Sequence, residues 1–196
     1  MIKAVVFDLG MVVFDWQIIY REFAKEIDVP FDELMRVFFS LTEKASTGKQ
    51  SLEEFLQEFT KAVGHPDKWQ DLRKKEVVGF VLIEPTIELL KELEGRFRLA
   101  ALTNAEPGII DEIEEKFKIK KYFELVVDSS VEGIMKPDKR IYEITAERLG
   151  VKPEECLFID DLKENVEGAR KVGFKAIQFG DPVEGVKEIK KALGLG

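Results

Sequence analysis

Groups that could perform chemistry follow short apolar segments, or open a helical pattern, at four places in the chain. The carboxylate of Asp8 follows Ala4–Phe7, Thr103-Asn104 follow Phe97–Leu102, Lys136 precedes Pro137–Leu149, and Asp160-Asp161 follow Leu157–Ile159. Taken singly, each has an ordinary explanation as a strand end, a turn, a helix cap or a solvated lysine. Their repeated position beside an apolar run indicates a common site.

The residue types suit phosphoryl transfer. Asp8 and Asp161 can hold a hard cation such as Mg²⁺, which takes one or two carboxylates together with waters and phosphate oxygens. Asp8 can also attack phosphorus to form an aspartyl-phosphate. Thr103 and Asn104 can donate hydrogen bonds to phosphoryl oxygens, and Lys136 supplies a positive charge for the transferring group.

These residues require a frame that brings strand ends together. From residue 85 onward, apolar runs of strand length alternate with helical patterns, and Ala4–Phe7 belongs to the same set. This alternation predicts an α/β fold, a Rossmann-like parallel sheet flanked by helices. Ligands of such sheets bind at the carboxyl ends of the strands, where all four places would meet.

A helical segment interrupts this alternation directly after the first strand. Residues 17–80 show helical spacing with no convincing strand, and Ser51 with Glu54 forms a capping-box pattern. We therefore expect a core of residues 1–14 and 82–196 and an inserted α-helical cap of residues 15–81. The cap phenylalanines have helical spacing and are expected in its core rather than on a substrate surface: Phe23, Phe31, Phe38, Phe39, Phe55 and Phe59.

Composition narrows the partners. A net charge of −8 disfavours nucleic acid and acidic membrane surfaces. His65 is the only histidine and Cys156 the only cysteine, which excludes multi-histidine zinc sites and an intrachain disulfide. No apolar run approaches the ~18 residues of a membrane span, and the first residues form a strand candidate rather than a signal peptide. We expect a cytoplasmic protein, monomeric or homodimeric.

Four segments in order resemble the motifs of the haloacid dehalogenase (HAD) superfamily. They are Phe7-Asp8-Leu9-Gly10-Met11-Val12-Val13, Leu102-Thr103-Asn104, Lys136-Pro137, and Phe158-Ile159-Asp160-Asp161. The resemblance covers the whole chain. It implies a Rossmann-like core, a helical cap, Mg²⁺ held by Asp8, Asp161, Asp160 and the carbonyl of Gly10, and Asp8 as the nucleophile of phosphate monoester hydrolysis.

Gly10 departs from the pattern of the family's phosphatases, which usually carry a second aspartate there as general acid and base. The metal site survives this change because glycine keeps its carbonyl, but acid–base help, typically worth about 10²–10⁴ in rate, is lost. The Asp-Leu-Gly sequence resembles a branch of sugar-phosphate phosphatases. Asp15, which equally suits a helix start, is a candidate replacement acid.

The sequence therefore predicts a Mg²⁺-dependent phosphatase that hydrolyses a small phosphorylated metabolite, with a sugar phosphate as the class suggested by the resemblance. Asp8 and Lys136 are the predicted catalytic residues, and Thr103, Asn104 and Lys136 the predicted phosphate-binding residues. Two alternatives stay open: a catalytically weak binding or regulatory protein, because of Gly10, and a 2-haloacid dehalogenase, which needs no metal.

Overall fold

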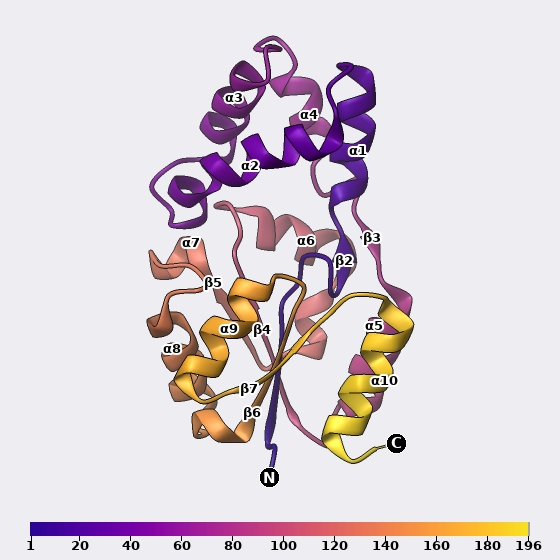
Figure 1. The fold of residues 1–196 in the computed structure, drawn as a ribbon, viewed down its shortest axis with the longest axis vertical. Coiled ribbons are helices and arrows are strands. Elements are labelled where there is room, and N and C mark those ends of the chain that lie inside the picture. Colours follow the sequence, from indigo (N-terminus) through magenta and orange to yellow (C-terminus); the bar gives the residue numbers. More distant parts are fainter. Residues whose placement is uncertain (196) are drawn as a thin grey trace.

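A five-stranded parallel sheet forms the centre of the lower part of the molecule (Figure 1). The computed structural model describes residues 1–195. The strand order is β5-β4-β1-β6-β7, and the bounds are β1 Ala4–Phe7, β4 Arg98–Thr103, β5 Leu125–Asp128, β6 Cys156–Asp160 and β7 Lys175–Gln178. The predicted α/β fold class is confirmed.

Strand β1 lies at the centre of the sheet because its side chains are apolar on both faces. Val5 and Phe7 belong to one hydrophobic core, and Ala4 and Val6 belong to the core on the opposite face. Phe7 pairs with Ala101 of β4 and with Ile159 of β6. The residue after Phe7 therefore leaves the sheet between the carboxyl ends of two neighbouring strands.

Helices cover both faces of this sheet (Figure 1). Helices α8 and α9 pack together on one face, and α5 and α10 pack together on the other. The helices and short helical turns of this part are α5 Glu84–Leu93, α6 Ile109–Phe117, η1 Ile119–Tyr122, α7 Ser129–Glu132, α8 Lys139–Leu149, η2 Pro153–Glu155, α9 Lys163–Val172 and α10 Pro182–Leu193. No helix within residues 1–195 is long and apolar enough to cross a bilayer.

Four helices lie together above the carboxyl edge of the sheet (Figure 1). They are α1 Gln17–Glu26, α2 Phe31–Ser46, α3 Leu52–Ala62 and α4 Trp69–Lys75. The capping box of Ser51 and Glu54 opens α3, as predicted. Phe55 and Phe59 are fully buried, but Phe39 is 47% exposed, so the expectation that all six phenylalanines are core is wrong. We refer to residues 16–76, which contain α1–α4 and the turns between them, as the cap and to the remainder as the core.

The cap joins the core through a small antiparallel ribbon of β2 (Phe14–Asp15) and β3 (Val81–Leu82). The sequence analysis did not predict this ribbon, because two residues are too short to show strand periodicity. Phe14 stacks on Phe80 beside it, with ring centroids 5.4 Å apart.

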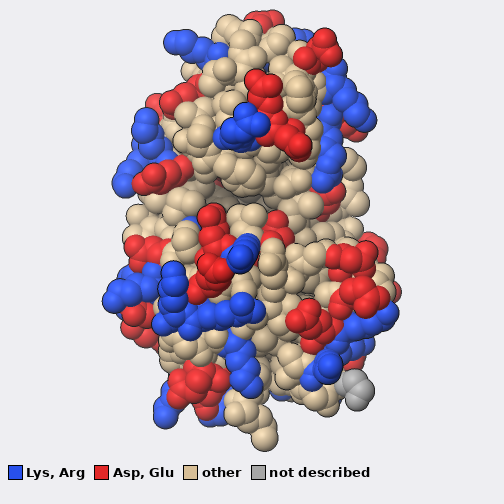
Figure 2. Space-filling model, in the orientation of Figure 1, with Lys and Arg blue, Asp and Glu red and all other residues tan. Residues whose placement is uncertain are grey.

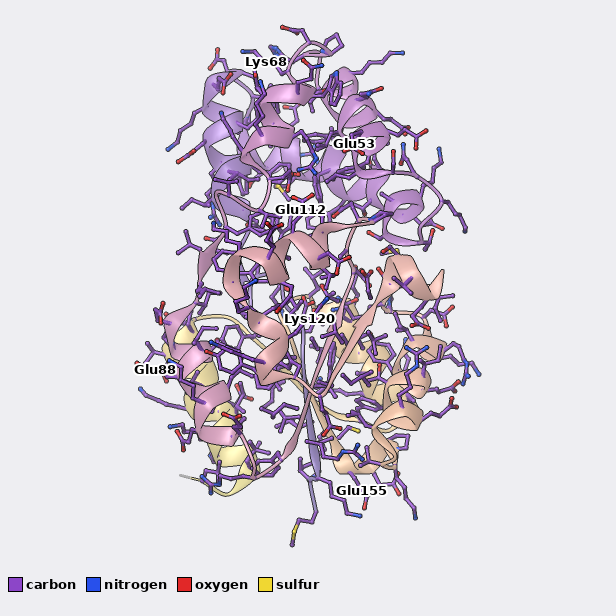
Figure 3. The ribbon with its side chains drawn as sticks, turned by 180° about the vertical axis from the view of Figure 1, so that it is seen from behind. Glu53, Lys68, Glu88, Glu112, Lys120 and Glu155 are labelled. Carbon is purple, nitrogen blue, oxygen red and sulfur yellow. The ribbon has the colours of Figure 1, made fainter. Side chains whose placement is uncertain are left out.

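Further contacts connect cap and core, among them the following two. Arg73 of α4 pairs with Glu53 of the cap and with Glu112 of α6. Both glutamates are labelled in Figure 3. Gly48, in the turn after α2, approaches α7 so closely that a Cβ there would overlap the carbonyl oxygen of Ser130. The cap is thus attached to the core at the ribbon, through Arg73 and at Gly48.

Candidate active site

A cavity of about 410 Å³ lies between the cap and the carboxyl edge of the sheet. The space-filling view shows the surface hollowed at this junction (Figure 2). Six of the predicted site residues line it: Asp8, Gly10, Thr103, Asn104, Lys136 and Asp161. The seventh, Asp160, is fully buried behind them.

Lys136 forms the electrostatic centre of this edge. Its ammonium donates to Asp8 Oδ1 at 2.9 Å, to Asp160 Oδ2 at 2.7 Å and to the Leu102 carbonyl at 2.9 Å. The side chain is 1% exposed, and burial opposes its charge, but the carboxylates of Asp160 and Asp8 outweigh burial and raise its pKa. All three donors of the lysine are therefore used to hold the site together.

Asp8 presents one oxygen to the protein and one to the cavity. Oδ1 accepts from the Leu9 amide at 2.8 Å and from Lys136, whereas Oδ2 accepts from no donor within residues 1–195. Burial is the main cause that raises the pKa of Asp8 to about 6; Lys136 lowers it and Asp160 raises it. The free oxygen is thus a fixed, weakly solvated carboxylate oxygen facing the cavity.

The two neighbouring aspartates at the end of β6 are held differently. Asp160 accepts from the Leu162 amide at 2.9 Å and from the Asn165 amide group at 3.0 and 3.1 Å, in addition to Lys136. No other residue among 1–195 donates to the carboxylate of Asp161. Burial, followed by the charges of Asp8 and Asp160, raises the pKa of Asp161 to about 7.

Asn104 and Thr103 end strand β4 with different contacts. The Asn104 side chain accepts from the Lys136 backbone amide at 2.9 Å and donates to the Lys136 carbonyl at 3.0 Å. It therefore fixes the backbone that carries Lys136. The Thr103 hydroxyl has no hydrogen-bond partner within residues 1–195, and Thr103 lines the cavity at 4% exposure.

Trp16 occupies the space next to Gly10. A Cβ at residue 10 would lie 2.9 Å from the indole Nε1 and 3.0 Å from Cδ1. Asp15 accepts from the Gln17 amide and pairs with Arg21 at 3.0 Å, and it does not line the cavity. Position 10 thus carries no carboxylate, and Asp15 does not lie beside Asp8.

The donor set fits a divalent cation. Carboxylate oxygens from Asp8, Asp160 and Asp161 lie within 4.8 Å of one another. Asn165 Oδ1, beside them, is buried and has no hydrogen-bond partner. Three acidic groups and an unused oxygen acceptor are the ligand chemistry of Mg²⁺ and Ca²⁺, and a cation would relieve the repulsion that raises the pKa of Asp161.

The cavity residues that the sequence analysis missed include Trp16, Tyr20, Glu76 and Glu106. Glu106 lies two residues after Asn104, so the strand-end rule that found Thr103 and Asn104 could have included it. Glu76 directly follows α4, and no local sequence pattern distinguishes it from the other acidic residues of that segment.

The comparisons with known proteins agree with this architecture. The family model of haloacid dehalogenase-like hydrolases matches residues 2–173. The chain therefore belongs to this family of hydrolases, and the resemblance stated from its motifs is confirmed.

The curated relatives of the chain include two phosphatases and one much longer protein. It is 30% identical to phosphatase MT3486 of Mycobacterium tuberculosis, over 98% of this chain and 95% of the relative. It is 25% identical to the sesquiterpene phosphatase astK of Aspergillus oryzae, over 98% and 97%. The match to acyl-CoA dehydrogenase family member 10 of Mus musculus is 41% identical over 76 residues, 39% of this chain and 7% of that protein.

Solved structures share the fold. A HAD family enzyme of Bacteroides thetaiotaomicron, crystallised with magnesium and inorganic phosphate, superimposes with a TM-score of 0.73 at 21% identity, over 92% of this chain and 95% of that chain. At this identity the likeness shows the fold, including the helical elements above the sheet.

Proposed function

We propose that this protein is a Mg²⁺-dependent phosphatase that hydrolyses a small phosphorylated metabolite through an aspartyl-phosphate on Asp8. One observation carries the proposal: Asp8 Oδ2 faces the cavity without a protein donor, while Lys136 and the Leu9 amide hold Oδ1. A carboxylate fixed in this way is oriented to attack a group that enters the cavity.

In the first step an oxygen of Asp8 forms a bond to phosphorus as the bond to the leaving oxygen breaks. The Thr103 hydroxyl donates to a phosphoryl oxygen. Lys136 keeps its three contacts, so its charge acts on the phosphoryl group through space while its geometry orients the nucleophile. Asn104, by holding the backbone of Lys136, is a positioning residue in this scheme.

Asp8, Asp161 and the Gly10 carbonyl would hold the Mg²⁺, and Asp160, whose oxygens are occupied by Lys136, Asn165 and Leu162, would act behind them. When bound, the cation supplies positive charge that offsets the repulsion between a carboxylate and a phosphate dianion. The protein side of the site is thus ordered before substrate enters.

No carboxylic acid stands beside Asp8 at position 10 to protonate the leaving oxygen. The leaving alkoxide therefore takes its proton from solvent, and water hydrolyses the acyl-phosphate without a base at this position. This favours substrates whose leaving groups are weakly basic. Sugar phosphates are the class suggested by the motif resemblance, and those esterified at the anomeric oxygen satisfy this condition better than simple alkyl phosphates.

The relatives support the reaction class. Two curated proteins matched over nearly their whole length carry the word phosphatase in their names, and the Bacteroides structure holds magnesium and phosphate. We further propose a cytoplasmic location and a monomeric or homodimeric state.

The experiment measures hydrolysis of p-nitrophenyl phosphate with Mg²⁺, and again after removal of the metal with EDTA. We expect activity that requires Mg²⁺ and that is abolished in Asp8→Asn, because the amide is not a nucleophile. Asp32→Asn, an equal change on the exposed side of α2, is the matched control and should retain activity. Absence of activity in the wild type, or equal activity in wild type and Asp8→Asn, would exclude the proposal.

A further inference from the structure

The cavity extends from Asp8 to an aromatic wall formed by the cap. Four side chains make this wall: Trp16, Tyr20, Phe38 and Phe39. The Trp16 ring lies 5.0 Å from Phe38 and 5.3 Å from Tyr20, and Phe38 and Phe39 meet edge to face at 5.6 Å. The wall is continuous, and the 47% exposure of Phe39 shows that solvent reaches it.

Two glutamates line the same cavity. Glu76 is 4% exposed and accepts from the Tyr20 hydroxyl at 2.5 Å, which leaves its second carboxylate oxygen without a donor in residues 1–195. Glu106 is partly buried, and no side chain of the described residues donates to it. Buried carboxylates are normally paired with a cation, and neither of these is.

Among the described residues, no positively charged group near Glu76 is available to neutralise its carboxylate. Arg73 lowers the pKa of Glu76, but its guanidinium is already paired with Glu112 and Glu53. Burial, together with the charges of Glu106 and Glu112, raises that pKa to about 8. Burial and the charge of Asp128 raise the pKa of Glu106 to about 7.

The cavity as a whole also has more carboxyl groups than positive charges. Its lining includes one lysine, Lys136, whose donors are all used, and five carboxyl groups: Asp8, Glu76, Glu106, Asp161 and Glu164. A divalent metal at Asp8 and Asp161 would offset the charge at that end. It would leave the two carboxyl groups at the other end, Glu76 and Glu106, without a cation beside the aromatic wall.

We propose that this end of the cavity binds an organic cation, so that the substrate is a phosphate monoester whose leaving group carries an ammonium group. The carboxylates of Glu76 and Glu106 pair with the positive charge, and the faces of the aromatic wall attract the alkyl-substituted ammonium by cation–π interaction. The inference rests on the proposed phosphatase function and adds the class of leaving group to it.

The test compares phosphate esters that differ only in charge. Trimethylammonioalkyl phosphates with four or more methylene groups are matched with their tert-butyl analogues, because at this distance the ammonium group no longer changes the basicity of the leaving oxygen. With Mg²⁺ present, we expect kcat/KM to be about tenfold higher for the charged member of at least one pair. This advantage should grow between about pH 6 and about pH 9, as Glu106 and Glu76 ionise.

The variants locate the effect. In the Glu76→Gln/Glu106→Gln double variant, the charged-to-neutral ratio of kcat/KM should fall to about one. Glu115→Gln, the same change on the exposed side of α6, should keep the wild-type ratio. Because the ratio is also measured in the wild type, the test does not depend on the folding of the double variant.

The possible results separate the two proposals. Turnover of p-nitrophenyl phosphate with a ratio of one or below for every matched pair would overturn the cation inference and leave the phosphatase intact. Preference for a neutral sugar phosphate over all the cationic esters would overturn it as well. Failure to hydrolyse p-nitrophenyl phosphate would reject the phosphatase function itself.

Discussion

The indole of Trp16 lies directly against Gly10, so that a Cβ at residue 10 would come within 2.9 Å of Trp16 Nε1. Real Cβ atoms essentially never approach another heavy atom so closely, and the ring is packed between Tyr20 and Phe38. The missing acid at position 10 is therefore part of a local arrangement in which an aromatic ring fills the space.

This contact decides the outcome that we expect for Gly10→Asp. The single variant should not raise turnover of alkyl phosphates, because the new side chain collides with Trp16. The Gly10→Asp/Trp16→Ala variant has room for the carboxyl group and should raise kcat on alkyl phosphates by up to about 10²-fold relative to Trp16→Ala. Steady-state kinetics on a simple alkyl phosphate measure this difference.

Trp16→Ala alone is the control, because it removes the ring without supplying an acid. Should Gly10→Asp by itself raise alkyl-phosphate turnover, the ring moves aside readily and the steric explanation is wrong.

The lack of an acid also predicts a steep dependence on the leaving group. Aryl phosphates should be hydrolysed about 10²-fold faster than alkyl phosphates of similar size, because an aryloxide departs without protonation. A plot of log kcat against leaving-group pKa measures the slope. A flat plot obtained when the chemical step is rate-limiting would show that another residue supplies the proton. Halide release from 2-haloacids without Mg²⁺ would instead support the dehalogenase alternative.

Removal of Lys136 should destabilise the fold as well as the reaction. Lys136→Met keeps the length of the side chain but leaves Asp8 and Asp160 buried without their common cation, at an expected cost of about 3–5 kcal/mol in the free energy of unfolding. Urea unfolding measures the loss. Lys187→Met breaks only the exposed pair with Glu184 and should change little. Equal stability of the two variants would show that Lys136 does not hold the edge together.

Glu76 gives a pH-dependent prediction. Its pKa rises on folding from about 4.5 to about 8, so between these values the folded chain holds a proton that the unfolded chain has released. Stability from this group is complete below about pH 4.5 and is lost as pH rises to about 8, by a few kcal/mol at about 1.4 kcal/mol per pKa unit. Glu76→Gln cannot ionise, so its stability relative to wild type should increase from about pH 5 to about pH 8 in urea unfolding.

The comparison with Glu76→Gln cancels the titration of the groups that do not interact with Glu76. A relative stability that is the same at both pH values would mean that Glu76 is already ionised in the folded protein.

The core fold could be predicted from sequence because its signals are local and repeated. Apolar runs of strand length alternate with helical patterns, and each strand end carries a polar residue, so Asp8, Thr103 and Asp160 could be assigned to one edge. The capping box of α3 is equally local and occurs as predicted. The ribbon of β2 and β3 is too short to leave such a signal.

The interior of the cavity could not be predicted, because it depends on how the cap lies over the core. Phe38 and Phe39 have the helical spacing of core residues, yet they line the cavity, since α2 faces the site as well as the cap interior. Glu76 and Glu106 lie 30 positions apart along the chain and act on one another only after cap and core are assembled. The sequence also could not show that Lys136 holds Asp8 and Asp160, or that Asn104 holds the backbone of Lys136, because these contacts are seen only in the folded structure.

The absence of a side chain at Gly48 has a consequence for how closely the cap can approach the core. The turn after α2 meets α7 backbone to backbone at Ser130, whereas the ribbon on the other side is held by stacked rings and hydrogen bonds. A side chain at residue 48 would collide with the Ser130 carbonyl, so glycine is what allows the cap to pack against α7 on this side.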